Sequence, residues 1–458
     1  SKASETPLVV TAGQQDTRHL ATEPWLSGDL VALAAPVTKW AQEVRRGEDV
    51  GKALRRAFSI ARTAPCGPVF LSLPMDVLDQ PVDGPTPPAS ATPRLGASPD
   101  AERLAERLAA HDPDKVIVLL GDDLPAAAAV GLVAFAEAGG YAVWGTQLTS
   151  RSAFPSAHPC WAGVLKPDFA VMRQRLETAE AIVLVGGRAF VAYPYRDVRP
   201  IPEGVAVHHV ADNPEAFGRE HPADTALLGD IGATLAEVAR ALGRRLDRAV
   251  VARRLEARAQ AKDLHVARIR EEIAAGAGEL PLSPDLAVMT VSDALPENTL
   301  LANDSAATFG KVQELLMTRP GRYFFARGGV LGCNMPAAVG AALMHDGPVA
   351  SFVGDGGAMY SPQALWSAAK YGAKVLFFVF NNRRYGVLQT IARQLGCPNA
   401  VAGRFVGMDV DDPAIDFQAL AASMGVPSVR ADDPDAIRAA IAEALTRDGP
   451  SLIEIAVK

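Results

Sequence analysis

The chain has 458 residues, of which 49% are hydrophobic and 21% are charged, a globular composition that allows about three domains. Its formal net charge of −7 argues against a surface for nucleic acid. The sequence contains no apolar run of about 18 residues and opens with no secretory signal, so we expect no membrane span.

Cysteine and histidine spacing argues against a zinc site. Four cysteines are widely scattered along the chain: Cys66, Cys160, Cys333 and Cys397. This spacing favours reduced thiols in the cytoplasm over a disulfide framework. His208 and His209 lie together in an apolar strand pattern, where neighbouring side chains point to opposite faces, so we interpret both as structural.

The N-terminal region, residues 1–80, carries two buried-strand patterns, at 7–13 and 69–73, with a helix pattern over 48–64 between them. Two strands and their helices cannot bury both faces of a stable α/β sheet. We therefore expect this first domain to be incomplete at its N-terminus.

A linker rich in proline and glycine at residues 81–98 leads to a middle domain at 99–243. Its expected helices cover 99–110, 125–138, 168–178 and 232–243, and its expected strands cover 116–120, 142–144, 182–185 and 205–210. This alternation predicts a parallel sheet. The glycines at 121 and at 186–187 follow strands without forming G-x-G-x-x-G, which favours a structural domain over a flavin-binding one.

A charged helical connector at 244–281 precedes the C-terminal domain at 282–458. Strands are expected there at 300–302, 323–325, 349–353, 375–380 and 452–457. The last of these domains repeats the alternation of the middle one, so the chain as a whole is expected to be an α/β protein built on parallel sheets.

Small and amide residues end two of these buried strands. Gly354-Asp355-Gly356 follows 349–353, and Asn381-Asn382 follows 375–380. Between them, Ser361 is expected to cap a helix, with Pro362 in its first turn and Gly372 as its stop.

The strand-helix-strand unit would bring both strand ends to one edge of the sheet. Asp355 and Asn382 would then face one crevice, where a carboxylate and an amide oxygen suit Mg²⁺ or Ca²⁺. Gly354, Gly356 and Gly357 would let a diphosphate approach the backbone closely.

A spacing of 24 residues separates Gly356 from Asn381, as in the GDG and NN motif of thiamine-diphosphate enzymes. Further matches include His158-Pro159-Cys160, Leu331-Gly332 and Tyr385-Gly386. On these residues the chain, from about residue 7 to its end, resembles the thiamine-diphosphate-dependent decarboxylases, above all the benzoylformate decarboxylases. The resemblance implies three Rossmann-like parallel-sheet domains, the first incomplete.

The resemblance also implies the site residues. The cofactor thiamine diphosphate would be bound by Ala306, Ala307, Leu331, Gly354, Asp355, Gly356, Gly357, Ala358, Asn382, Tyr385 and Gly386. The metal, Mg²⁺ or Ca²⁺, would be bound by Asp355, Asn382 and the carbonyl of Arg384. The substrate pocket would be lined by Phe325, Val387, Leu388 and Ile391. The family's catalytic glutamate would lie upstream of Ser1 and has no counterpart here.

Four positions depart from the family pattern. Ala306 and Ala307 stand where threonine and serine contact the diphosphate, and Ile391 stands where an aromatic ring is expected. Ser283 replaces a histidine, and a serine cannot relay protons near neutral pH as imidazole does. Benzoylformate itself is therefore in doubt as the substrate.

The resemblance implies a lyase that decarboxylates a 2-oxo acid, aromatic or branched, to an aldehyde without oxidation. It also implies a homodimer or homotetramer, since the cofactor of this superfamily lies between two subunits. Two alternatives stay open: a carboligase similar to acetolactate synthase, and a non-catalytic homologue or fragment that serves as a scaffold.

Overall fold

The structure is a computed structural model that describes residues 1–85, 88–193, 195–276, 278–305, 308–315 and 319–458. Two compact units comprise residues 1–96 with 212–214, and residues 97–211 with 215–458. The described strands form three sheets, and every neighbouring pair within them is parallel. The predicted fold class is confirmed. Within the described ranges, no helix is long and apolar enough to cross a membrane.

The first unit holds a sheet of order β1–β3–β2, with β1 at Leu8–Gln14, β2 at Trp40–Glu43 and β3 at Pro68–Pro74. Its helices are α1 (Leu30–Ala34), α2 (Gly47–Arg62) and α3 (Met75–Leu78). The small side chains of Ala53, Ala57 and Ala61 on α2 cluster with Val69 and Leu71 of the central strand. The sequence does not predict β2.

The middle sheet of the second unit has the order β6–β5–β4–β7–β8–β9. The strands are β4 (Val116–Leu120), β5 (Ala142–Thr146), β6 (Trp161–Leu165), β7 (Ala181–Val185), β8 (Ala206–Ala211) and β9 (Thr225–Leu228). From β4 the chain proceeds outward to β6, and from β7 it proceeds outward the other way to β9. The strand order therefore reverses between β4 and β7, which makes their carboxyl ends a topological switch point.

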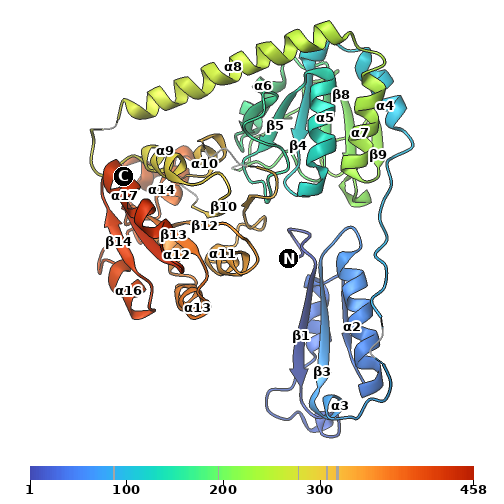
Figure 1. Cartoon of the computed structure of the whole chain (residues 1–458), viewed down its shortest axis with the longest axis vertical. Coiled ribbons are helices and arrows are strands. Elements are labelled where there is room, and N and C mark those ends of the chain that lie inside the picture. Colours follow the sequence, from blue (N-terminus) through green and yellow to red (C-terminus); the bar gives the residue numbers. More distant parts are fainter. Residues whose placement is uncertain (86–87, 194, 277, 306–307, 316–318) are drawn as a thin grey trace. The chain divides into compact units, whose positions relative to one another are not determined.

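Helices cover both faces of this sheet (Figure 1). They are α4 (Ala101–Ala109), α5 (Ala129–Gly139), α6 (Phe169–Leu176) and α7 (Ile231–Leu242). Val116 and Val118 of β4 join the core shared with α4, α5 and α7, whereas Ile117 and Leu119 join the core shared with α6. Burial on both faces explains why β4 is apolar at every position.

The histidines of β8 contact other protein groups. His208 Nδ1 lies 3.0 Å from Thr225 Oγ1, and His209 Nε2 lies 2.7 Å from the Gly186 carbonyl oxygen. Burial lowers the pKa of both rings, that of His208 to about 4. Both rings are thus held neutral, as a structural role requires.

Two connections join the middle sheet to the C-terminal sheet within the second unit. Helix α8 (Arg248–Ala274) packs Leu255 against the middle core and Ile269 and Ile273 into the C-terminal core (Figure 1). The segment 150–152 after β5 forms backbone hydrogen bonds with β11 (Tyr323–Phe324) and the residues on either side of it, including Phe325 N–H to the Ser150 carbonyl at 3.0 Å.

The C-terminal sheet has the order β11–β10–β12–β13–β15–β14. Besides β11, its strands are β10 (Leu300–Asp304), β12 (Val349–Gly354), β13 (Val375–Asn381), β14 (Ser428–Ala431) and β15 (Ser451–Ala456). The helices are α9 (Pro284–Ala294), α10 (Phe309–Leu315), α11 (Asn334–Ala342), α12 (Asp355–Ala358), α13 (Ala364–Tyr371), α14 (Gly386–Gln394), α15 (Pro398–Val401), α16 (Phe417–Ser423) and α17 (Pro434–Leu445).

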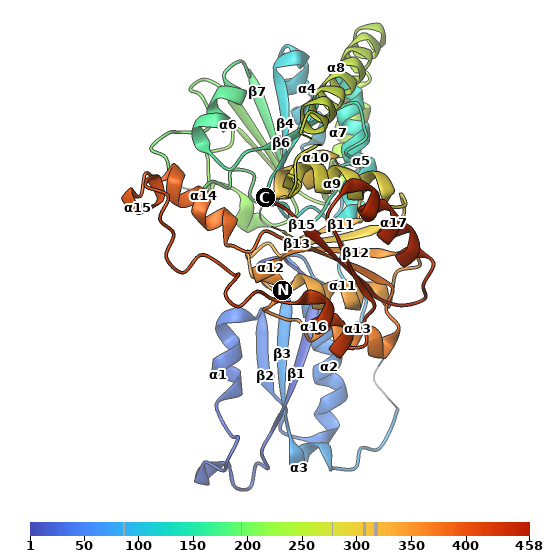
Figure 2. The same ribbon diagram turned by 90° about the vertical axis from the view of Figure 1, so that its left-hand side faces the viewer.

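This sheet is also covered on both faces, by α9 and α17 on one and by α11, α13 and α16 on the other (Figure 2). Phe352 and Phe378 point into the first core, and Val353 and Val379 point into the second. Side chains along β12 and β13 therefore alternate between the two cores.

The expected helix between β12 and β13 is α13, and its start was predicted wrongly. Ser361 does not cap it, because the Ser361 hydroxyl donates to the Gly332 carbonyl instead. Gly372 does end the helix, in the left-handed conformation with φ of 60°.

Candidate active site

Asp355 and Asn382 follow the ends of two neighbouring parallel strands. Gly354 of β12 pairs with Phe380 of β13 in the sheet register, so the residues after them emerge at one edge. The Asp355 side chain is buried, and its Oδ1 accepts the Gly356 N–H at 2.8 Å. Its Oδ2 is also buried but has no hydrogen-bond partner among the described residues.

Burial raises the pKa of Asp355, and the backbone N–H groups of Gly356 and of residues 382–384 oppose that rise. The loop after β13 therefore reaches the carboxylate of Asp355. A buried carboxylate oxygen without a donor is costly unless a cation or another donor meets it.

Local hydrogen bonds shape the loop after β13. Asn381 donates to Glu454 Oε1 at 2.7 Å, and its Oδ1 accepts the Arg383 N–H at 3.1 Å. Arg383 has a positive φ of 55°, which turns the chain sharply. Asn382 Oδ1 accepts the Arg384 N–H at 3.2 Å. The asparagine side chains of the loop thus hold its backbone in shape by local hydrogen bonds.

A cavity of about 290 Å³ opens between these strand ends. It is lined by most of the residues that the sequence predicts for the site: Leu331, Gly354, Asp355, Gly356, Gly357, Asn382, Arg384, Tyr385, Gly386, Val387 and Leu388. The structure brings all three candidate metal ligands together in one pocket with part of the candidate cofactor and substrate residues.

Some predicted residues are not among those that line the cavity. Ala358 and Phe325 are buried in the two cores on either side of the sheet. Ile391 lies half-buried on α14, one helical turn after Val387 and Leu388, and does not itself line the cavity. Ala306 and Ala307 lie outside the described residues.

Two glycines, Gly354 and Gly356, lack side chains at positions where this matters for the cavity. A methyl group added at Gly354 would meet no atom within 4 Å, so the backbone there borders open space. One added at Gly356 would lie 2.7 Å from the Tyr385 ring. Gly354 therefore leaves space for a ligand, whereas Gly356 lets the loop of Tyr385 pack against α12.

Comparison with known proteins agrees with this pocket. Residues 308–455 match the C-terminal TPP-binding domain of thiamine pyrophosphate enzymes, and residues 101–238 match their central domain. Benzoylformate decarboxylase from Pseudomonas aeruginosa is 34% identical over 99% of this chain and 82% of that protein. The chain belongs to the thiamine diphosphate-dependent enzymes.

Solved structures of thiamine diphosphate enzymes share the fold. Benzoylformate decarboxylase from Polynucleobacter necessarius has a TM-score of 0.86 and 26% identity, covering 100% of this chain and 83% of that one. A 4-hydroxybenzoylformate decarboxylase from Rhodococcus jostii has a TM-score of 0.85 and 28% identity, covering 100% and 84%. The acetolactate synthase large subunit from Parasynechococcus marenigrum is 26% identical over 99% of this chain and 72% of that protein.

The pocket fits a thiamine diphosphate with its divalent cation. Asp355 offers a buried oxygen that no described residue meets with a hydrogen bond, Asn382 offers an amide oxygen, and Gly354 borders open space. These are hard oxygen ligands, and the described residues contain no cluster of three or more His, Cys, Asp or Glu for a metal. A cation held here would complete its shell with phosphate oxygens and water.

Leu331, one of the residues expected to bind the cofactor, reaches the pocket from the segment before α11. Gly332 beside it has φ of 83°, and a side chain there would collide with Tyr360 at 2.3 Å. The Gly332 N–H donates to Asp304 Oδ2 at 2.9 Å, and its carbonyl accepts the Ser361 hydroxyl. Both backbone groups of Gly332 are thereby fixed.

Several pocket residues are not among the site residues that the sequence predicts. They are Pro284, Asp304, Ser305, Thr308, Tyr360, Phe380 and Val457. Asp304 and Ser305 do carry a signal, since Asp304 ends the buried strand β10 and Ser305 follows it, much as Asp355 follows β12. Phe380 carries a similar signal, because it stands directly before Asn381 at the end of β13.

Ser283, which stands where a histidine is expected, caps a helix. Its Oγ accepts the Leu286 N–H at 3.1 Å at the start of α9. The next residue, Pro284, lines the pocket. The Ser283 hydroxyl thus serves as the N-cap of α9, next to the pocket wall.

Proposed function

We propose that this protein is a Mg²⁺- and thiamine diphosphate-dependent lyase that removes CO₂ from a 2-oxo acid and releases an aldehyde. The observation that carries the proposal is the buried Oδ2 of Asp355, which has no hydrogen-bond partner within the described part of the chain and lies in a cavity shared with Asn382. The proposal is also supported by the membership of this chain in the thiamine diphosphate enzymes and by its 34% identity to a benzoylformate decarboxylase.

In this proposal the strand-end residues hold the cation and the diphosphate. Asp355 Oδ2, Asn382 Oδ1 and the Arg384 carbonyl would bind Mg²⁺. The open space at Gly354 and the backbone of Gly356 and Gly357 would accommodate the diphosphate. When bound, thiamine diphosphate supplies a nucleophilic ring carbon and accepts the electron pair left by CO₂.

Apolar side chains would select and shelter the substrate. Val387 and Leu388 line the cavity, and Phe380 borders it from β13. Such a wall excludes water and favours an aromatic or branched 2-oxo acid over a charged one. Leu331 would support the bent shape of the cofactor.

Binding tests the first part of the proposal. We expect calorimetry to detect thiamine diphosphate binding that requires Mg²⁺, and Asp355→Asn to weaken it by about a hundred-fold. Asp346→Asn changes an exposed carboxylate of the same domain in the same way and should leave binding unchanged. Wild-type protein that binds the cofactor equally well after treatment with EDTA would contradict the metal assignment.

Product analysis tests the reaction. The protein is incubated with single 2-oxo acids, including benzoylformate, pyruvate and a branched-chain acid, with and without added aldehyde. We expect CO₂ and free aldehyde in equal amounts. The 26% identity to acetolactate synthase favours a second candidate, carboligation, which would give hydroxyketone products without free aldehyde and would replace the lyase proposal.

We also propose that the protein assembles into a homodimer or homotetramer. Large side chains at the cavity are exposed in the single chain, among them Tyr360 and Leu331. Covering them with a second copy would close the pocket from water. Light scattering that gives the mass of one chain at all concentrations would refute this.

A further inference from the structure

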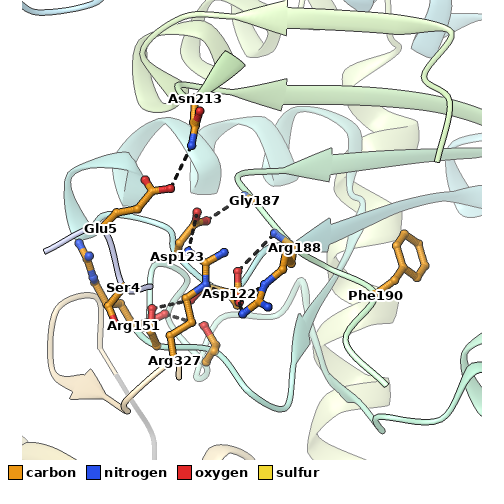
Figure 3. A network of polar contacts seen from close by, with 12 residues as sticks. Ser4, Glu5, Asp122, Asp123, Arg151, Gly187, Arg188, Phe190, Asn213 and Arg327 are labelled. Atoms are coloured by element: carbon orange, nitrogen blue, oxygen red, sulfur yellow. Dashed lines mark hydrogen bonds and ion pairs between the residues drawn. The ribbon is translucent and has the colours of Figure 1, made fainter. Parts of the chain in front are cut away.

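Asp122, at the end of β4, is a buried carboxylate that holds two arginines from different loops (Figure 3). Its Oδ2 accepts from Arg188 Nη2 at 2.8 Å and Nε at 3.1 Å, and from Arg327 Nε at 2.6 Å. The side chains of Asp122 and Arg327 are 1% and 6% exposed. Arg327 also lies 3.5 Å from Asp123.

This cluster occupies the switch point of the middle sheet. The Gly121 N–H donates to the Val185 carbonyl at 2.8 Å, and a side chain at Gly121 would lie 2.7 Å from the Gly187 nitrogen. In doubly wound sheets, ligands bind in the crevice at this position. Here Arg327, which comes from the C-terminal sheet, places its guanidinium against the switch-point carboxylates.

Arg327 also begins the short segment that ends at the pocket. Gly328, Gly329, Val330 and Leu331 are all exposed, and Gly329 has φ of 64°. Two glycines give this segment wide backbone freedom. At its far end, Gly332 is fixed by Asp304 and Ser361.

We propose that Arg327, held by Asp122, is a positioning residue that sets where Leu331 stands in the pocket. The segment 327–332 is held at both ends, and residues 328–331 between them are exposed. Within it the Gly329 N–H donates to the Ala326 carbonyl at 2.8 Å, a turn that starts from the Arg327 end. The path of the segment therefore depends on this turn and on the two ends. Loss of the Arg327 end would let the glycine pair move and would release Leu331. The role assigned to Leu331 rests on the proposed function. The hold that Asp122 exerts on Arg327, and through Arg327 on the segment 327–332, is called the clamp below and does not rest on it.

Arg327→Met tests the clamp, with Arg188→Met as the matched control. Both variants remove one arginine from the same carboxylate, but Arg188 follows β7 and does not lead to the pocket. Two quantities are measured: hydrogen exchange of the Gly329 and Gly332 amides in the protein without cofactor, and the Kd for thiamine diphosphate with Mg²⁺.

We expect Arg327→Met to speed exchange at both amides by about ten-fold or more and to raise the Kd by about ten-fold. Arg188→Met should leave both within about two-fold of wild type. Arg327→Lys keeps the charge without the planar fork and should give intermediate values; it serves as the test if Arg327→Met does not fold.

Unchanged exchange in the Arg327 variants, or equal changes in the Arg188 variant, would overturn the clamp. Faster exchange with an unchanged Kd would overturn the link between Arg327 and Leu331's place in the pocket. If exchange is faster in Arg327→Met but the wild-type protein binds no thiamine diphosphate, the proposed function is refuted and the clamp is still supported.

Discussion

The carboxyl group of Asp304 accepts a hydrogen bond from the Gly332 N–H at 2.9 Å while almost wholly buried in the pocket wall. Burial raises the pKa of this group from 3.8 to about 6. The folded protein therefore binds this proton more tightly than the unfolded chain does. The contribution of Asp304 to stability is greatest below pH 3.8 and is lost as the pH rises to about 6.

Asp304→Asn is neutral at every pH and removes this dependence. Without cofactor, wild type should lose about 1 kcal/mol of unfolding free energy relative to the variant between pH 5 and pH 7. Urea unfolding of both proteins at pH 5 and pH 7 measures this difference in unfolding free energy. A difference between the two proteins that is the same at both pH values would show that Asp304 titrates normally.

His208 should give a pH dependence of the opposite sign. Its folded pKa of about 4 lies below the ordinary 6.5 because the ring is buried. The unfolded chain therefore gains a proton on acidification that the folded protein does not, and stability falls as the pH drops from 6.5 towards 4.

His208→Gln keeps a polar group near Thr225 but does not titrate. From pH 7 to pH 5, wild type should lose about 2 kcal/mol relative to this variant. His265, which lies exposed on α8, provides the control, since His265→Gln should change nothing. Parallel pH profiles for wild type and His208→Gln would contradict a depressed pKa.

Gly386→Ala should separate cation binding from stability. The added methyl group would lie 2.7 Å from Asn382 Nδ2, so the amide that we assign to Mg²⁺ must move. We expect about ten-fold weaker Mg²⁺ activation of cofactor binding, with unchanged or higher thermal stability because alanine favours the helix α14.

Gly340→Ala is the matched control for that variant. Gly340 lies on α11, and a methyl group there would meet nothing within 4 Å. It should raise stability and leave Mg²⁺ binding unchanged. Equal Mg²⁺ affinities in the two alanine variants would argue against Asn382 as a ligand.

Ser283→Ala should lower the unfolding free energy by about 1 kcal/mol because the cap of α9 is lost. Ser283→Asn retains a capping side chain and should restore most of it. Cofactor affinity should stay within about two-fold of wild type in both variants, since the hydroxyl is used by the Leu286 N–H. A large loss of cofactor affinity in Ser283→Ala alone would instead place the hydroxyl in the site.

The strands that the sequence does not predict share one physical property. They are β2, β6, β9 and β14, and each lies at the edge of its sheet. An edge strand buries less of its surface, so its residues need not form an apolar run. β12 and β13 are buried on both faces and are readily predicted from their apolar composition.

The site was predictable where it depends on strand ends and not where it depends on distant contacts. Asp355 and Asn382 follow from two buried strands and one crossover. The pairing of Asp122 with Arg327 joins residues 205 positions apart in the sequence, and nothing in either local sequence signals it. The close approach of Tyr360 to Gly332 is likewise a contact between separate segments of the chain.

The backbone pairing of residues 150–152 with β11 has a consequence for proteolysis of the second unit. Main-chain hydrogen bonds such as Phe325 N–H to Ser150 survive any change of side chain. A protease that cuts the chain just after α8 should therefore yield two pieces that still migrate together under native conditions and separate only in denaturant.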